Sequence, residues 1–244
     1  MRASPRVSVV IPAYNEAKRI PQTLGTIREH LESNGCNAEV IVVNDGSSDE
    51  TGPTVEELRS RWSCLRLVQN PGNQGKGYSV RSGVFQACGE VVLFTDADLS
   101  APINEMTKLV EPILKGEYDM TFGSRAVDRS LIGVHQPLFR EASGRIFNLL
   151  VQAFIGLPFK DTQCGFKAFR REAAVPVFQR QTIMGFGFDP EILYIARKRG
   201  LRLLEVPVHW NHVEGTTVRF LSDSYKMFMD LLRIRWNDLC GRYR

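Results

Sequence analysis

The sequence predicts an α/β fold in which a mostly parallel sheet is flanked by helices. Short apolar runs alternate with segments of helical periodicity over the first half of the chain, as in doubly wound proteins. Polar and charged residues repeatedly stand where those runs end. The composition agrees, because a chain of 244 residues with 43% hydrophobic and 24% charged residues has enough apolar material for one large core.

The individual elements follow from the spacing of apolar residues. Apolar runs predict strands, and segments with an apolar residue every three or four positions predict helices. Because each strand is followed by a helix, we expect parallel pairing with right-handed crossovers. The strands are expected at 7–11, 40–43, 65–69, 91–95 and 119–123, and the helices at 20–31, 51–62, 78–88 and 103–115.

The C-terminal segment, residues 216–244, is predicted to be a basic amphipathic helix that follows a single domain of residues 1–215. Arg219, Lys226 and Arg233 recur there at every seventh position. Such a helix can lie in the interface of an anionic membrane, and packing on the domain with a solvated basic face is the alternative. Its apolar positions are Leu221, Tyr225, Phe228, Leu232 and Leu239, and further arginines follow at Arg235, Arg242 and Arg244.

Charge and cysteine content narrow the class of partner and the compartment. A net charge of +4 fits a phosphate-bearing substrate or an anionic membrane surface, and nucleic acid is not expected as a partner. The five cysteines are widely spaced, which predicts no zinc site and no disulfide framework and favours a reducing cytosol. No apolar run approaches the ~20 residues of a membrane span. We therefore expect a cytoplasmic protein that is peripheral on the cytoplasmic face of a membrane.

Two carboxylates, Asp96 and Asp98, stand directly after the apolar run at 91–95. In open α/β sheets, ligands bind beyond the carboxyl ends of the strands. Two hard oxygen ligands suit Mg²⁺ or Mn²⁺ shared with substrate phosphates, and a solvated acidic turn is the alternative. Polar side chains also follow the other predicted strands, so we expect a ligand crevice formed with Tyr14, Glu16, Asp45, Lys76, Ser124 and Arg125.

The glycine-rich turn at 72–77 is neither of the two common phosphate-binding fingerprints. It is not a Walker loop, because Asn70 stands at the first glycine position and Gly77 follows the lysine. It is not a dinucleotide fingerprint, because Val80 stands at the third glycine position. Backbone amides and Lys76 at a helix start can nevertheless hold a phosphate, and a solvated loop lysine is the alternative.

The strand-end motifs resemble those of the family-2 glycosyltransferases, whose GT-A fold has a Rossmann-like sheet. The matching segments occur in that family's order at 12–16, 44–47, 73–77, 96–98 and 123–125. Motifs further along the chain are similar to those of the dolichyl-phosphate β-glucosyltransferases, relatives of the dolichyl-phosphate mannose synthases. These more specific motifs are at 161–167, 171–173, 188–191, 193–196 and 208–210, followed by Glu214 and Gly215.

The resemblance implies roles for the donor side of the crevice. Asp45 is suited to accept a hydrogen bond from a uracil N3–H, with an Asx-turn or helix-capping role as the alternative. Asp96 and Asp98 are implied to hold a divalent cation, Mg²⁺ or Mn²⁺, that bridges the diphosphate. The complete set implied to bind the nucleotide sugar is Pro12, Tyr14, Glu16, Asp45, Lys76, Asp96, Ala97 and Asp98.

The implied acceptor is a polyprenyl or dolichyl phosphate, which needs cations rather than a general base. A phosphate monoester has a second pKa of about 6 and is largely ionised at neutral pH. Arg125, Arg140 and Ser143 match the family's phosphate-binding positions, and with Asp98 they are the candidate catalytic residues. Candidate sugar or acceptor contacts are Ser124, Asp161, Gln163, Asp189, Glu191 and Trp210, with a buried ion pair as the alternative for Asp189.

An apolar stripe that precedes Gly156 is a candidate route for the acceptor's tail. Its members recur at helical spacing, and ordinary core packing is the alternative for any such stripe. They are Phe139, Phe147, Leu150, Val151, Phe154 and Ile155.

The expected activity is metal-dependent, inverting transfer of glucose from UDP-glucose to a polyprenyl phosphate. Three alternatives remain open: the same reaction with GDP-mannose, transfer to a glycan hydroxyl, and a sugar-nucleotide-binding module without activity. Transfer to a hydroxyl needs a general base, which Asp161, Asp189 or Glu191 would supply.

Overall fold

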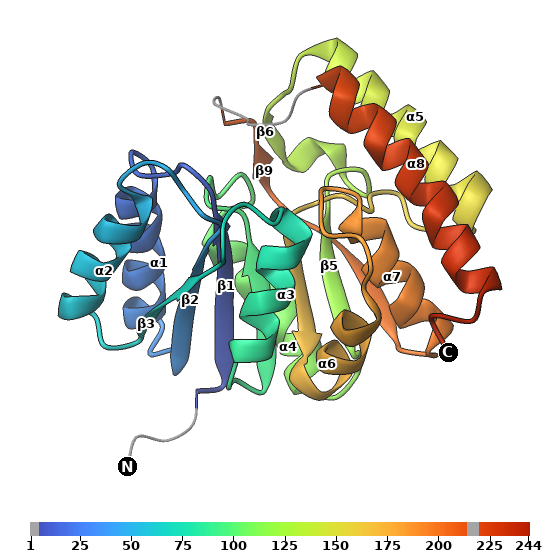
Figure 1. Ribbon diagram of the computed structural model, residues 1–244. Helices are drawn as coiled ribbons and strands as arrows, with labels where there is room; N and C mark the ends of the chain where they lie inside the picture. Colours follow the sequence, from blue (N-terminus) through green and yellow to red (C-terminus); the bar gives the residue numbers. More distant parts are fainter. Residues whose placement is uncertain (1–4, 214–219) are drawn as a thin grey trace.

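The computed structural model describes residues 5–213 and 220–244, which form a central sheet between two layers of helices (Figure 1). Seven strands form the main sheet in the order β3-β2-β1-β4-β7-β5-β8. These strands are β1 (Val7–Ala13), β2 (Ala38–Asn44), β3 (Leu65–Gln69), β4 (Val91–Thr95), β5 (Met120–Ser124), β7 (Phe166–Arg170) and β8 (Leu203–Pro207). A second, two-stranded sheet pairs β6 (Ile132–Val134) with β9 (Trp210–Asn211).

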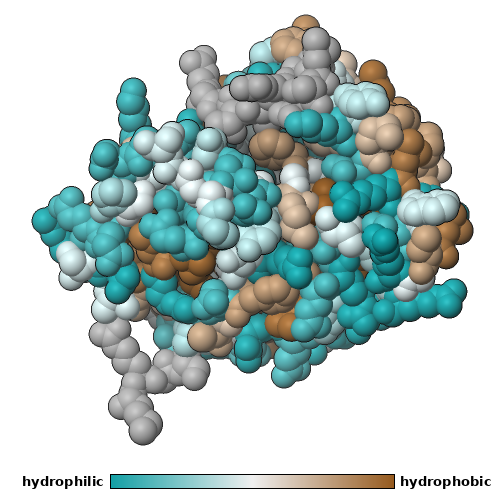
Figure 2. Space-filling model, in the orientation of Figure 1, coloured by the Kyte–Doolittle hydropathy of each residue, from teal (hydrophilic) through white to brown (hydrophobic). Residues whose placement is uncertain are grey.

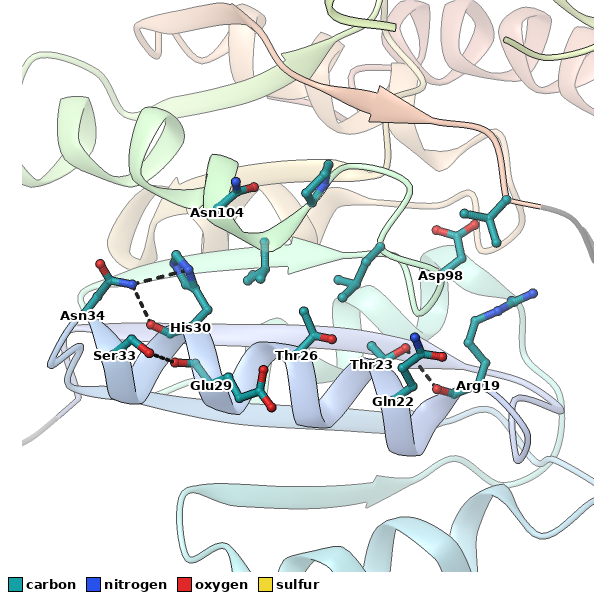
Figure 3. A pocket seen from close by; sticks show the side chains of 14 residues that line it. Arg19, Gln22, Thr23, Thr26, Glu29, His30, Ser33, Asn34, Asp98 and Asn104 are labelled. Atoms are coloured by element: carbon teal, nitrogen blue, oxygen red, sulfur yellow. Dashed lines mark hydrogen bonds between the residues drawn. The ribbon is translucent and has the colours of Figure 1, made fainter. Parts of the chain in front are cut away.

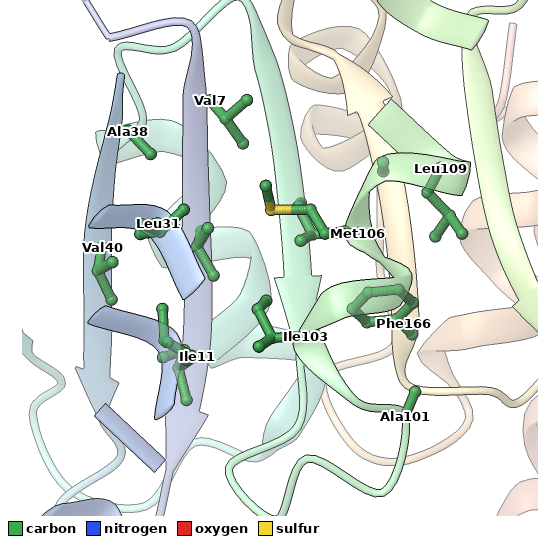
Figure 4. Packing of buried hydrophobic residues seen from close by; sticks show 14 of the residues in the cluster. Val7, Ile11, Leu31, Ala38, Val40, Ala101, Ile103, Met106, Leu109 and Phe166 are labelled. Atoms are coloured by element: carbon green, nitrogen blue, oxygen red, sulfur yellow. The ribbon is translucent and has the colours of Figure 1, made fainter. Parts of the chain in front are cut away.

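Apolar side chains on both faces of the sheet build two separate core layers. In β1, Val7, Val9 and Ile11 belong to one layer and Val10 belongs to the other, as expected where successive side chains alternate. The first layer, part of which Figure 4 shows, lies under α1 (Ile20–Ser33), α2 (Thr51–Arg61), η1 (Ile103–Glu105) and α4 (Met106–Leu114). The second lies under α3 (Lys76–Gln86), α5 (Leu138–Ile155), α6 (Arg171–Arg180), α7 (Phe188–Lys198) and α8 (Phe220–Leu239).

The predicted α/β fold is confirmed, and so are all five predicted strands. β1 pairs with β2 and β4 in parallel, and β2 pairs with β3 in parallel. Strands β1 to β5 all run in the same direction, so the sheet is mostly parallel as predicted; β7, for which no strand was predicted, lies antiparallel between β4 and β5. β7 follows α5 and precedes α6, and its place in the sheet depends on the long return of the chain through α5.

The reversed direction of β7 has a consequence for the ligand crevice. Thr95 at the end of β4 pairs with Phe166 at the start of β7. The residues just before β7 therefore lie beside Asp96, at the same edge where the parallel strands end. A segment seventy positions later in the sequence thus joins the strand-end loops.

The C-terminal helix exists and lies outside the sheet, beside α5 and α7 (Figure 1). It begins at Phe220, so the predicted boundary near residues 215 and 216 lies outside the described residues, as do Glu214, Gly215 and Arg219. Helix η2 (Arg129–Leu131) is a short turn before β6. None of the helices in the described part of the chain is long and apolar enough to cross a bilayer.

Candidate active site

The polar residues that follow successive strands surround one cavity of about 980 Å³. It lies at the carboxyl edge of the sheet, and α5 and α8 close its far side. Most of the residues predicted to bind the nucleotide sugar or the acceptor line it. These are Pro12, Tyr14, Glu16, Asp45, Lys76, Asp96, Ala97, Asp98, Arg125, Arg140, Ser143, Gln163, Asp189 and Trp210.

The loops after β1 and β2 are tied together by reciprocal hydrogen bonds. Asn15 has a left-handed backbone conformation, with φ 56°, and its N–H donates to Ser47 Oγ at 2.9 Å. Its side-chain oxygen accepts from the N–H of Ser48 at 2.9 Å. The Glu16 N–H donates to Thr51 Oγ1 at 2.8 Å, which joins the same loop to α2. These bonds hold Tyr14 and Glu16 at the rim of the cavity.

Asp45 anchors the glycine-rich turn. Its Oδ1 accepts from Asn70 Nδ2 at 2.7 Å and from the Gln74 N–H at 3.1 Å, and its Oδ2 accepts from the Gly75 N–H at 2.8 Å. The alternative roles considered for Asp45 belong to its neighbours instead. Asn44 accepts from the Ser47 N–H, and Asp49 accepts from the N–H of Thr51 at the start of α2.

The turn after β4 presents two carboxylates to the cavity. Leu99 has φ 48°, which reverses the chain so that Asp98 Oδ1 accepts from the Ser100 N–H at 2.9 Å. Asp96 Oδ1 lies 2.6 Å from Lys76 Nζ. A Cβ atom on Gly165 would lie 2.0 Å from Asp96 Oδ2, so the residue before β7 must be glycine for Asp96 to keep its place.

The charges near these carboxylates shift two pKa values. Burial lowers the pKa of Lys76, but the carboxylates of Asp96 and Asp189 outweigh it, so its pKa is raised and the side chain is a cation at neutral pH. Burial raises the pKa of Glu16; Asp98, Asp49 and Asp96 add to the rise, and Arg19 opposes it. The cavity therefore has a strongly acidic edge with one lysine set into it.

The donor set at this edge fits a cation that is shared with a substrate. Within residues 5–213 and 220–244, no three His, Cys, Asp or Glu side chains are grouped as metal ligands. Asp96 and Asp98 supply hard oxygen atoms, and Mg²⁺ usually binds one or two carboxylates together with substrate phosphates. The geometry thus suits a metal that needs the diphosphate to complete its ligands.

Arg125 is held by Asp161 rather than left pointing into solvent. Its Nε lies 2.7 Å from Asp161 Oδ2 and its Nη2 lies 2.9 Å from Asp161 Oδ1, a bidentate pair. Its guanidinium also lies over the Trp210 ring, 5.5 Å from the centroid. Burial raises the pKa of Asp161, but Arg125 outweighs it and lowers the pKa to about 2.

Three predicted contact residues, Ser124, Asp161 and Glu191, are buried behind the wall of the cavity. Ser124 Oγ donates to Glu205, whose carboxylate also accepts from the Asp161 N–H. Glu191 accepts from the Ile183 N–H at 2.8 Å and from the Tyr243 hydroxyl at 2.6 Å. Each of these three side chains is bonded within the protein and, unlike Asp45, none of them lines the cavity, so their contact with the substrate stays a prediction.

Asp189 forms the buried ion pair considered for it and also reaches the cavity. It lies 2.6 Å from Nζ of the fully buried Lys167, and it also lines the cavity. Burial raises the pKa of Asp189 against the opposing effect of Lys167 and Lys76. Asp189 is therefore placed between two lysines, one buried and one at the edge of the cavity.

The far side of the cavity is formed by α5 and α8, which contribute the apolar side chains Ile146, Phe147, Leu150, Met227 and Phe228 together with polar ones. Arg140 and Ser143 lie on the first turns of α5, and Ser143 Oγ donates to the Phe139 carbonyl at 2.7 Å. Of the predicted tail stripe, Phe147 and Leu150 line the cavity, whereas Val151 and Ile155 belong to the core and Phe139 and Phe154 are exposed. The sequence analysis missed Gly165, Phe186, Ile146 and Met227, which line the cavity from segments whose position depends on tertiary packing.

A second hollow of about 720 Å³ runs along α1 and shares Arg19 and Asp98 with the cavity. Polar side chains of α1 line it, and Thr26 and His30 point toward it (Figure 3). Several of them are bonded within the helix, since Asn34 donates to the His30 carbonyl. This hollow has no counterpart in the sequence analysis.

Comparison with known proteins identifies the family. A family model described as "Glycosyl transferase family 2" matches residues 8–178. A dolichyl-phosphate beta-glucosyltransferase of Trichomonas vaginalis is 38% identical over 93% of this chain and 72% of its own length. The enzymes of the same name from Saccharomyces cerevisiae and Homo sapiens are 34% and 32% identical, over 98% of this chain and 76% and 78% of their own lengths.

A solved structure shows the same fold. Glucosyl-3-phosphoglycerate synthase from Mycobacterium tuberculosis, crystallised with Mn²⁺, UDP and phosphoglyceric acid, matches with a TM-score of 0.65 at 21% identity. The match covers 98% of this chain and 78% of that one, so the predicted GT-A-like architecture is confirmed. The family match and these alignments together show that the chain belongs to glycosyl transferase family 2.

Proposed function

We propose that this enzyme transfers glucose from UDP-glucose to a polyprenyl or dolichyl phosphate, with a divalent cation and with inversion at the anomeric carbon. The observation that carries the proposal is the two-sided cavity, which has carboxylates and a lysine at the strand ends and apolar side chains on α5 and α8. A sugar nucleotide is polar and anionic, whereas the acceptor joins a phosphate to a hydrocarbon tail. The names of the curated relatives support the same donor sugar and acceptor lipid.

On the donor side, Asp45 and the tied loops after β1 and β2 are suited to the nucleoside. Asp96 and Asp98 would hold Mg²⁺ or Mn²⁺ against the diphosphate, and the cation would stabilise the charge of departing UDP. Lys76 lies beside Asp96, where its ammonium group can pair with the same diphosphate. Tyr14, Glu16 and Ala97 line this end of the cavity.

On the acceptor side, a phosphate oxygen would attack the anomeric carbon opposite the bond to UDP. The new carbon–oxygen bond forms as the old one breaks, and UDP departs with the bonding electron pair, so the configuration inverts. An ionised phosphate needs no base. Arg140 and Ser143 line the cavity close to its apolar side, and Arg125, held by Asp161, lines it nearby.

The positions of the buried carboxylates favour a phosphate acceptor over a sugar hydroxyl. A hydroxyl acceptor would need a general base within hydrogen-bond reach. Asp161 and Glu191 are buried behind the cavity wall, and Asp189 is paired with Lys167. The apolar lining on α5 and α8 also suits an isoprenoid tail better than a glycan.

The test is transfer from labelled UDP-glucose, and separately from GDP-mannose, to a short polyprenyl phosphate with Mn²⁺, with Mg²⁺ and with a chelator. We expect a chelator-sensitive glucosyl lipid from UDP-glucose alone, and we expect Asp98→Asn to abolish it while Glu57→Gln, an exposed acid of α2, leaves it unchanged. Product from GDP-mannose alone would show that UDP-glucose is not the donor. Metal-dependent binding of UDP-glucose without any lipid product would show that a polyprenyl phosphate is not the acceptor.

A further inference from the structure

Helix α8 carries a continuous apolar stripe that is exposed on the side away from the protein. Tyr225, Trp236 and Leu239 are 66%, 65% and 70% exposed. With Met229 and Leu232, they recur at alternating intervals of four and three residues, which places all five within about 80° of one another around the helix. The opposite face is the one that packs, because Leu231, Ile234 and Asn237 are buried. The stripe therefore has no function in the core.

Basic side chains border this stripe on both sides. At 3.6 residues per turn, Lys226, which also lines the cavity, and Arg233 fall along one edge, and Arg235 falls along the other. All three are exposed. The acidic residues of the described part of α8 point inward, since Asp238 accepts from the Tyr194 hydroxyl and Asp230 lies against Gly187. The outward surface of α8 is thus apolar along its middle and cationic at its margins.

Helix α5 adds a second exposed apolar row beside the first. Leu138, Phe139, Ile146 and Leu149 are all more than half exposed, on the side opposite the buried Val151 and Ile155. The two helices touch, because the Phe154 and Phe228 rings meet edge to face with centroids 5.7 Å apart. Figure 2 shows hydrophobic residues gathered along the upper right edge of the molecule, where Figure 1 places α5 and α8.

The exposed rows adjoin the apolar side of the cavity. Ile146 belongs both to the exposed row of α5 and to the cavity lining. Phe147 and Leu150 of α5, and Met227 and Phe228 of α8, line the cavity from the same two helices. A hydrocarbon chain that leaves the cavity along these apolar side chains reaches the exposed apolar surface through Ile146, which belongs to both.

We propose that the outward faces of α5 and α8 form a docking surface for a lipid bilayer with anionic headgroups, oriented so that the cavity opens toward the lipid. This docking surface rests on the proposed function, because a lipid-linked acceptor is what requires the cavity to face a bilayer. Tryptophan and tyrosine are favoured at membrane interfaces, and arginine and lysine beside them attract anionic headgroups. The docking surface is made of Leu138, Phe139, Ile146, Leu149, Tyr225, Met229, Leu232, Trp236 and Leu239 with the basic neighbours Lys226, Arg233 and Arg235.

The charge pattern favours a bilayer over a second copy of the chain as the occupant. In a two-fold symmetric dimer, the same patch meets itself. Basic residues on both margins of α8 would then face basic residues, which is repulsive. An anionic headgroup layer complements both margins at once while the apolar stripe enters the boundary with the acyl chains.

The test is flotation of the full chain with vesicles of equal parts phosphatidylcholine and phosphatidylglycerol, compared with phosphatidylcholine alone. We expect binding to the mixed vesicles that weakens with salt. Trp236→Ser with Leu239→Ser should lower the affinity at least about tenfold, since two large apolar groups leave the interface. Arg233→Gln with Arg235→Gln should remove most of the preference for anionic vesicles. Phe85→Ser is the matched control, an exposed aromatic residue on α3 whose loss should change nothing.

A parallel assay separates this proposal from the proposed function. Transfer to a water-soluble, short-chain polyprenyl phosphate without vesicles should be unchanged in Trp236→Ser with Leu239→Ser, which also shows that the variant is folded. Unchanged flotation of both variants, or a dimer in solution that the Trp236 and Leu239 changes dissociate, would overturn the docking surface. Vesicle binding without transfer from any donor would leave the docking surface standing and overturn the proposed function.

Discussion

Lys76 Nζ and Asp96 Oδ1 lie 2.6 Å apart, which couples the start of α3 to the end of β4 at the edge of the cavity. Residues from two different strand-end loops thereby share one charge pair. The pair sets a cation beside a carboxylate that is a candidate metal ligand. It connects the glycine-rich turn to the acidic turn, and the first prediction follows from it.

We expect Lys76→Gln to lower the kcat/KM for glucosyl transfer by about a hundredfold, because the departing diphosphate loses a cation in a site sheltered from water. Steady-state kinetics with labelled UDP-glucose measures this. Lys115→Gln is the control, since Lys115 also pairs with a carboxylate, Glu111, but lies on the surface. Equal activity of Lys76→Gln and wild type would show that Lys76 does not assist the transfer.

Gly165→Ala should also lower activity by about a hundredfold, because its Cβ would lie 2.0 Å from Asp96 Oδ2 and would displace the carboxylate. The matched change is Gly25→Ala in α1, where a Cβ meets nothing within 4 Å. That variant should keep full activity and gain about 0.5 to 1 kcal/mol in free energy of unfolding. Wild-type activity in Gly165→Ala would show that Asp96 need not hold its position.

Asp161→Asn should lower the free energy of unfolding by about 3 kcal/mol at neutral pH, because it leaves the Arg125 guanidinium without its charged partner. The pKa of Asp161 is lowered to about 2, below its ordinary value of 3.8. The stabilisation is therefore present above about pH 4 and is lost as the pH falls through about 2.

Urea denaturation of wild type and Asp161→Asn at a series of pH values checks this prediction. The difference between the two should shrink as the pH falls below 4. Glu57→Gln, which removes an exposed pair with Arg61, should cost about 0.5 kcal/mol or less. A constant difference at every pH would mean that the pair does not act through the charge of Asp161.

Asp230→Asn should stabilise the protein at neutral pH by about 1 to 2 kcal/mol, allowing for partial exposure. Burial raises the pKa of Asp230 to about 6; Arg233 opposes the rise and Glu191 adds to it. A carboxyl whose pKa is raised on folding favours the folded state while it is protonated. The stabilisation of the fold by the protonated Asp230 carboxyl is therefore complete below about pH 4 and is lost as the pH rises through about 6.

The measurement is chemical denaturation of wild type and Asp230→Asn between about pH 4 and pH 7. The two proteins should have similar stability at the acidic end and diverge toward neutral pH. A wild type that is the more stable of the two at neutral pH would show that the Asp230 carboxylate is favourably bonded where it lies against Gly187.

Local sequence was sufficient to predict the first five strands, the helices between them and the loops that carry the polar residues. These features depend on local periodicity, and parallel strands necessarily end at one edge of the sheet. That is why the sequence predicts Tyr14, Asp45, Lys76, Asp96 and Asp98 around one cavity, and all five line it.

Tertiary contacts determine which polar side chains are bonded within the protein and which face the cavity. Asp161 and Glu191 are as polar as Asp98 in the sequence, but one is paired with Arg125 and the other holds the 182–183 segment and Tyr243. The antiparallel insertion of β7, which sets Gly165 against Asp96, likewise depends on contacts between distant segments. These contacts join residues that are far apart in the chain, so the local sequence does not predict them.

Helix α8 shows the same division. Its periodicity was sufficient to predict an amphipathic helix, and the structure gives a helix from Phe220 to Leu239. The predicted stripe included Phe228, which instead contacts Phe154, and it omitted Met229 and Trp236, which are exposed. A helix with apolar residues on more than one side can pack through any of them, and only the neighbouring α5 and α7 decide which side is buried and which remains outside.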